Sequence, residues 1–284
     1  MIRTVYTSVA ALALTAGASF AAGHAGTMGY ALTDGGSTLV VMADIAAPGE
    51  AETYALESNL DAIAFRPVTG DLLGLADGMI YTINPMSGEM TDLGATFMDD
   101  ATIGADAMVA FDFNNAIDAV RAVSSTGDNL VYFPDGFGDG DEKAGSVRRM
   151  TDLAYAEGDA NADATPMVFA NAYTNAIAGK TAESTFQYGL DAGTDSLVSV
   201  ANNAGTLETI GKVMVDGAEV DLSGMGGFDI LSPEEGSDMA YAVLQMEGAD
   251  SAGLYSINLE SAEATLLSDL GMGGINGFAV SGGM

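Results

Sequence analysis

Carboxylates and one tyrosine are the side chains that could carry acid–base chemistry in this sequence. The 284-residue chain has no cysteine and a single histidine, His24. Serine–histidine triads, cysteine–histidine dyads and histidine-rich zinc or copper sites are therefore not expected. Proton transfer would fall to Asp, Glu, Tyr or a metal-bound water. The best-placed candidates are Asp112, Tyr173 and Asp229, which occupy corresponding places in three repeated units.

The same three residues also allow a purely structural interpretation. A hydrolase or lyase would need two of these side chains within about 7 Å of each other, around a cavity that solvent reaches. In a structural role, Asp112 and Asp229 would point into separate sheet interfaces and bind backbone amides. The sequence leaves both alternatives open.

No cofactor is expected, and a solvated acidic loop is the favoured interpretation of residues 135–163, with a calcium site there as the alternative. The stretch "DANAD" (159–163) places Asp159, Asn161 and Asp163 at positions 1, 3 and 5 of a calcium loop. Ala164 stands where such a loop needs glycine, and Ala170 stands where it needs a bidentate glutamate. The 16 methionines are interpreted as core filler rather than as copper ligands.

A large excess of negative charge limits the partners. With 40 acidic and 8 basic residues, the formal net charge is −32, which repels nucleic acid and anionic lipid. No apolar run long enough to span a membrane occurs beyond the N-terminus. The charge indicates a well-hydrated surface, with a calcium-stabilised adhesion or matrix protein as an alternative.

The first 22 residues have the pattern of an export signal. Arg3 is followed by the apolar stretch "VAALALTAGA" (9–18) and by small residues up to Ala22. A short buried helix is the alternative. The pattern predicts a single mature domain, 23–284, in the periplasm or outside the cell, which without cysteine must be stable without disulfides.

Short strands separated by Gly, Asp and Asn turns repeat along the chain. A strand with a central aromatic residue opens each unit, at 62–66, 108–113, 169–175, 226–231 and 275–280. The aromatic residues recur 46 to 62 residues apart. Four strands in each such interval are typical of a β-propeller blade.

The two ends of the chain together supply one further blade. Three strands, expected at 28–33, 39–45 and 52–56, lack an opening strand, and the opening strand at 275–280 lacks followers. The sequence therefore predicts an all-β, five-bladed propeller closed by pairing the C-terminal strand with the N-terminal blade. A β-sandwich is the alternative.

Three further expectations concern individual segments. Residues 185–191 are expected to form the third strand of their blade. The two "GMGG" stretches, 224–227 and 271–274, are expected to be turns between blades. Residues 134–166 are expected to be a long surface loop with one possible strand, 148–156.

Four stretches in order, "AFRPVTGDLLGL", "FDFNNAIDAVRAVSSTGDNLVYFPDG", "NAYTN" and "GGFDI", resemble an exported bacterial family, domain of unknown function 4394, over roughly residues 28–280. The resemblance implies a propeller-like β fold and no established activity. Its motif positions include the candidate ligand-binding residues Arg66, Asp112, Arg121, Asn129, Tyr173, Asn175 and Asp229.

Asp118 and Arg121 are also interpreted as a structural ion pair across a turn. A non-catalytic binding or scaffold module is the favoured function. Its partner would be a protein or a small-molecule ligand of unknown identity.

Overall fold

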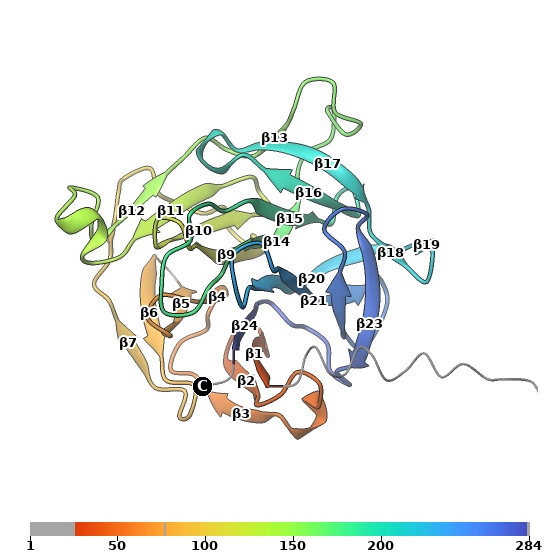
Figure 1. The fold of residues 1–284 in the computed structure, drawn as a ribbon, viewed down its shortest axis with the longest axis horizontal. Coiled ribbons are helices and arrows are strands. Elements are labelled where there is room, and N and C mark those ends of the chain that lie inside the picture. Colours follow the sequence, from red (N-terminus) through yellow and green to blue (C-terminus); the bar gives the residue numbers. More distant parts are fainter. Residues whose placement is uncertain (1–25, 77, 283–284) are drawn as a thin grey trace, which may run out of the picture.

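Five β-sheets surround a central axis in the computed structural model (Figure 1), which describes residues 26–76 and 78–282. Blade 1 contains, from the axis outward, β24 (Phe278–Gly282), β1 (Thr27–Thr33), β2 (Thr38–Met42) and β3 (Glu52–Ala55). Blade 2 contains β4 (Ala62–Phe65), β5 (Leu72–Ala76), β6 (Met79–Ile83) and β7 (Met90–Asp92).

The other three blades carry extra outer strands. Blade 3 contains β9 (Val109–Asn114), β10 (Ala119–Ser124), β11 (Asn129–Phe133), β12 (Ser146–Arg149) and β8 (Thr96–Phe97). Blade 4 contains β14 (Val168–Tyr173), β15 (Gln187–Asp191), β16 (Ser196–Val200), β17 (Thr206–Lys212) and β13 (Ala154–Tyr155). Blade 5 contains β20 (Leu222–Leu231), β21 (Met239–Met246), β22 (Gly253–Ile257), β23 (Glu263–Asp269), β18 (Met214–Val215) and β19 (Ala218–Glu219).

The only helical segments among the described residues are three 3₁₀ turns, η1 (Pro48–Glu50), η2 (Phe137–Asp139) and η3 (Asn202–Ala204). No helix in the described part of the chain is long and apolar enough to cross a membrane.

The five-bladed architecture and its closure are as predicted. Strand β24 pairs antiparallel with β1, from Thr27 opposite Gly282 to Ala31 opposite Phe278. The inner strands β4, β9, β14, β20 and β24 contact one another in a closed ring. The first and last described strands therefore share one sheet, which leaves no gap in the ring.

The hydrophobic core is divided into layers between neighbouring blades. One buried apolar cluster lies between each pair of adjacent blades, so that every blade face packs against the next. Phe113 packs between blades 2 and 3, for example, and Phe228 packs between blades 4 and 5. This explains the near-continuous apolar strands in the sequence, because the central strands are covered on both faces.

Two of the segment predictions are wrong. Residues 174–186 are mainly an irregular connection, so β15 is the second strand of blade 4, and β16 is the third. Residues 224–227 are not a turn, because they lie within β20, where the pairing with β21 shifts between Leu222 and Gly226. Gly226 has a φ of +146°, and a Cβ there would lie 1.9 Å from the Val243 carbonyl oxygen. The glycine therefore fits a bulge, while 271–274 does connect two blades.

The segment 134–166 is only partly a loop. It contains β12, the fourth strand of blade 3, and β13, which pairs with β17 of blade 4. Strands β8, β13 and β18 all pair in parallel with the fourth strand of a blade, and each belongs to the connection that arrives from the preceding blade. These short strands cover the outer edges of blades 3, 4 and 5, which would otherwise be open to pairing.

Candidate functional site

The central channel is constricted where the five inner strands come closest. The cavity at this point has a volume of about 10 Å³ and is lined by residues of all five blades. That is about the space of one water molecule. Asn171 lines the constriction, and its side-chain amide makes no hydrogen bond to any described residue. A ligand of any size must therefore bind on one side of the constriction or the other.

Asp112 and Asp229 connect neighbouring inner strands. Asp112 Oδ2 on β9 accepts a hydrogen bond of 2.7 Å from the Tyr173 backbone N–H on β14. Asp229 on β20 accepts 2.7 Å bonds from the backbone N–H of Ile230 and, across the interface, from that of Val280 on β24. The two carboxylates thus bind backbone amides at separate interfaces, which is the geometry that the sequence analysis assigns to a structural role.

Both carboxyl groups are costly to ionise. Each residue is 4% exposed. Burial, followed by the charge of Asp229, raises the pKa of Asp112 well above its usual value. Burial raises the pKa of Asp229 to about 7, although the bonds from Val280 and Ile230 act in the opposite direction. Neither group takes part in an ion pair within the described residues.

Arg121 and Tyr173 form a buried polar network between blades 3 and 4. Arg121 is 3% exposed. Its guanidinium donates to the Tyr173 hydroxyl at 2.7 Å, to Asn203 Oδ1 at 2.7 Å and to Asn129 Oδ1. The Tyr173 hydroxyl in turn lies 2.9 Å from Gln187 Oε1. Neutral oxygens therefore satisfy this buried cation, which would otherwise be strongly destabilising.

The predicted ion pair between Asp118 and Arg121 is wrong. Asp118, at the β9–β10 turn, pairs instead with Arg66 at the end of β4 in blade 2, where Arg66 Nε donates to Asp118 Oδ1 at 2.8 Å. Asp118 adopts a φ of +50° in this turn. Arg121 lies on β10 and reaches toward blade 4. The side chains of Asp118 and Arg121 therefore form contacts on opposite faces of blade 3.

Asn129 and Asn175 also hold neighbouring segments together. Asn129 Nδ2 donates to the carbonyl oxygens of Thr151 at 2.8 Å and Asn202 at 3.0 Å. Asn175, with a φ of +60°, accepts a hydrogen bond from the Gly236 N–H at 2.7 Å. Of the seven predicted ligand-binding residues, Asp229 alone is among the described residues that line any of three larger cavities, of about 660, 330 and 370 Å³.

The structure gives Asp159 and Asn161 a common partner. Asp159 accepts hydrogen bonds from Thr209 N at 2.7 Å and Thr209 Oγ1 at 2.7 Å, and Asn161 Nδ2 donates to the same hydroxyl at 2.9 Å. Asp163 is exposed and does not join them. Among the described residues, no group of three or more His, Cys, Asp or Glu could hold a metal ion. The "DANAD" segment is therefore tethered to β17 through Thr209.

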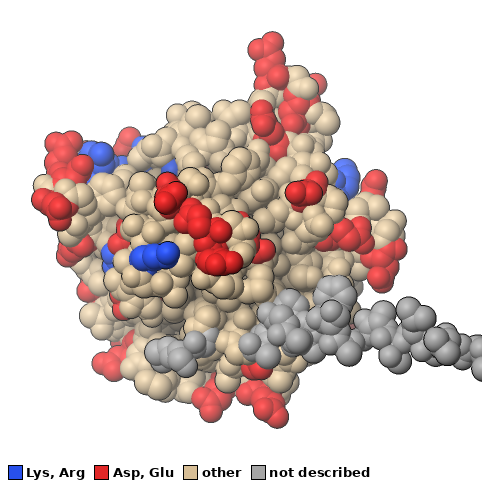
Figure 2. All heavy atoms as spheres, in the orientation of Figure 1, with Lys and Arg blue, Asp and Glu red and all other residues tan. Residues whose placement is uncertain are grey.

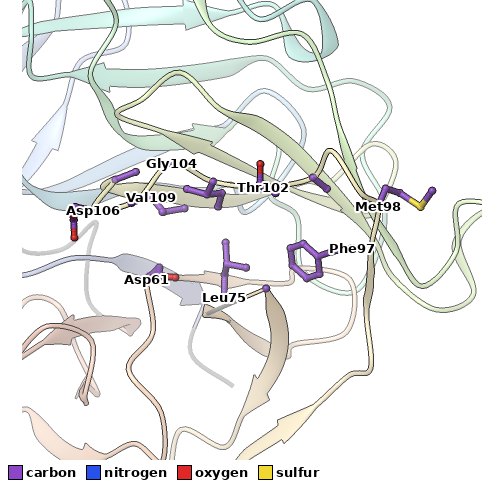
Figure 3. A pocket seen from close by; sticks show the side chains of 13 residues that line it. Asp61, Leu75, Phe97, Met98, Thr102, Gly104, Asp106 and Val109 are labelled. Carbon is purple, nitrogen blue, oxygen red and sulfur yellow. The ribbon is translucent and has the colours of Figure 1, made fainter.

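A large cleft lies between blades 2 and 3, at the end of the ring where the inner strands begin (Figure 3). Its volume is about 660 Å³. Leu75 of β5 and Phe97 of β8 both line it, and Val109 lies at the start of β9. Exposed Asp61 and Asp106 lie along the side where the inner strands begin, and no Lys or Arg lines the cleft.

A second, more apolar pocket of about 330 Å³ lies at the opposite end of the channel. It is formed where four chain segments meet, namely 65–70, 176–179, 229–231 and 280–282. Asp229 is its one ionisable lining residue. Neither pocket is predicted from the sequence. The only hint of the larger one is the unusually long segment 93–108 between the last strand of blade 2 and the first of blade 3.

The face of the molecule shown in Figure 2 carries more acidic than basic side chains. Asp and Glu form several groups along the visible periphery, whereas Lys and Arg appear in fewer places. His24 and the predicted export signal, residues 1–22, lie outside the described residues.

Replacing Tyr173 by Phe should lower the free energy of unfolding by about 1–3 kcal/mol, because buried Arg121 loses a hydrogen-bond acceptor. Chemical denaturation measures the change. Tyr188→Phe on β15 is the matched control, since Tyr188 is only half-buried and its hydroxyl has no hydrogen-bond partner among the described residues. An equal, small loss in both variants would contradict the role of the network.

Stability should increase as the pH is lowered from 8 to 5. The folded protein keeps a proton on Asp229 up to about pH 7, whereas an unfolded aspartate loses it near pH 4. Between these values the folded state binds more protons, so each pH unit contributes about 1.4 kcal/mol per such group. Thermal melts across this range should show that the melting temperature of Asp229→Asn changes less with pH than that of the unmodified protein. Asp163→Asn removes an exposed charge instead and should retain the slope, and equal slopes in all three proteins would refute the assignment.

Solved structures with a similar chain path include proteins of several kinds. A protein of unknown function from Bacteroides caccae is 9% identical, with 90% of this chain and 99% of that chain covered and a TM-score of 0.39. A chain of a nidogen/laminin complex is 12% identical over 90% and 98% of the two chains, with a TM-score of 0.44. An auxiliary nutrient binding protein from Bacteroides ovatus is 14% identical over 75% and 55%, with a TM-score of 0.43. No curated protein matches the sequence.

A family match covers most of the chain. The family described as "Domain of unknown function (DUF4394)" matches residues 40–279, from β2 through the start of β24. This range includes blades 2 to 5 entirely, together with the motif residues on β9, β10, β14 and β20. The chain therefore belongs to the DUF4394 family.

Proposed function

We propose that this protein is a non-catalytic, ligand-binding propeller, and that the cleft between blades 2 and 3 is its binding site. The observation that carries the proposal is the cleft itself. Its volume of about 660 Å³ lies within the range of small-molecule sites. It joins an apolar floor to a few polar groups, which is the usual composition of such sites.

The lining indicates what kind of ligand would fit. Phe97, Met98 and Ile103 offer apolar surface, and the exposed carboxylates of Asp61 and Asp106 line the same cleft. A chain with a net charge of −32 and no basic residue in this cleft disfavours anions. The proposed ligand is therefore a neutral or positively charged molecule, or peptide segment, with an apolar body.

The non-catalytic part of the proposal is supported by how the candidate acid–base groups are used. Asp112 and Asp229 accept hydrogen bonds from backbone N–H groups, and the Tyr173 hydroxyl accepts a hydrogen bond from Arg121. These bonds are what holds three pairs of neighbouring segments together. Neither Asp112 nor Tyr173 lines either large pocket.

We also infer that the protein is exported, because residues 1–22 combine Arg3, an apolar stretch and small residues in the order of an export signal. The chain recovered from its own cells should then begin at Gly23, which intact-mass spectrometry measures. A mature protein that still carries residues 1–22 would be evidence against export.

Ala105→Trp should block the cleft, since Ala105 is exposed and lines it. Nile red, a neutral apolar dye, should bind the unmodified protein with a rise in fluorescence. Its affinity should fall at least about tenfold in the variant, as expected when apolar contacts worth over about 1.4 kcal/mol are lost.

Ala178→Trp is the matched control, because Ala178 is an exposed alanine lining the other pocket. This variant should bind Nile red at the cleft as the unmodified protein does. If the dye does not bind, or if both variants bind it equally well, the cleft is not the site.

A further inference from the structure

We propose that the pocket of about 330 Å³ at the opposite end of the channel binds an organic ammonium ion with an apolar body, and that Asp229 is its counter-charge. This inference concerns a second site and does not depend on the cleft between blades 2 and 3. It is carried by the shape of the pocket, its lining and the place of one carboxylate in it.

The described lining of the pocket is mainly apolar. Phe65 and Val68 are partly exposed and offer carbon surface, and the buried residues Ile230 and Val280 complete the wall. Thr69 is polar, and Asp229 is the one ionisable group among the described lining residues. A ligand held here would bury apolar surface and meet a single carboxylate, so it would be both apolar and positively charged at one end.

Asp229 has unused hydrogen-bonding capacity. An ionised carboxylate offers about four acceptor positions, and the backbone N–H groups of Ile230 and Val280 occupy one on each oxygen. These two bonds also fix the orientation of the carboxylate on β20. An ammonium group can therefore bind without displacing any bond that holds the ring together.

The charges around Asp229 favour a cation. Burial, and then the charge of ionised Asp229, raises the pKa of Asp112 on β9, which favours the neutral form of Asp112. Neither forms an ion pair with an arginine or lysine of the described residues. A cationic ligand would compensate the charge of ionised Asp229, whereas a carboxylate ligand would be repelled by it.

The wall of the pocket includes a segment that spans two blades. Residues 176–179 follow β14 of blade 4, and the Gly179 N–H donates to the Pro67 carbonyl oxygen of blade 2 at 2.9 Å. The Ala176 N–H donates to the Ser232 hydroxyl at 3.0 Å, and the Ser232 N–H donates to the Ala176 carbonyl oxygen at 3.4 Å. The segment is thus held on both sides, and the pocket is preformed rather than assembled by the ligand.

The test compares three probes that share a phenylethyl body, namely 2-phenylethylamine, 2-phenylethanol and phenylacetate. Isothermal titration calorimetry at pH 8 with the full mature chain should show binding of the amine. The alcohol should bind at least about tenfold more weakly, because it lacks the charge-assisted hydrogen bond. Phenylacetate should not bind.

Variants assign the binding to this pocket. Ala178→Trp fills the pocket from its exposed rim and should weaken amine binding at least about tenfold, while Ala105→Trp in the other cleft should change it less than about twofold. Asp229→Asn should remove the preference for the amine over the alcohol. Thermal melts establish that each variant is folded, and Val68→Trp replaces Ala178→Trp if the latter is not.

The proposal is overturned if the amine does not bind, if the alcohol binds equally well, or if Ala105→Trp alone abolishes binding. The last result would assign amine binding to the cleft between blades 2 and 3. If the unmodified protein binds the amine but does not bind Nile red, the proposed function of the cleft is refuted and this second site stands.

Discussion

Backbone N–H groups on the channel side of the inner strands need acceptors, and this requirement shapes the centre of the protein. Each inner strand is the last strand of its sheet, so one of its edges has no sheet partner. Asp112 and Asp229 supply acceptors to the next inner strand around the ring. The consequence is two buried carboxyl groups with raised pKa values, in a chain already rich in negative charge. The bonds that join the blades therefore also create the electrostatic character of the channel mouth.

The overall architecture could be predicted because its causes are local or periodic. Aromatic opening strands, Gly and Asp turns and a period of about 50 residues indicate blades, and the unmatched strands at the two ends indicate closure. The short parallel strands β8 and β18 could not be predicted, because two residues carry no periodicity, and the pairing of β13, which lies within the strand expected at 148–156, depends on the neighbouring blade. Strand β16 is missed for a different reason, since residues 185–191 are expected to be the third strand of blade 4, whereas β15 is the second strand and β16 the third.

The functional site could be predicted less well than the fold, and the candidate residues show why. The motif residues Asp112, Arg121 and Tyr173 do lie together at the centre, yet their partners are backbone amides and each other. A polar residue that must bind a neighbouring strand looks the same in a sequence as one that must bind a ligand. The two large pockets have the opposite property. Their walls include Ala105, Ala178 and Gly179, small residues with no distinctive chemistry, which only the folded chain brings together.

Ring closure through β1 and β24 also bears on how the protein folds. Thr27 pairs with Gly282, so the last contact that completes blade 1 joins residues separated by nearly the entire chain. Closing so long a loop has a high entropic cost, and chains dominated by distant contacts fold slowly. Until β24 docks, the edge of β1 is exposed and the Val280 N–H cannot reach Asp229 on β20. During this time the seven-residue strand β1 has an unpaired edge, with which a strand of another chain can pair.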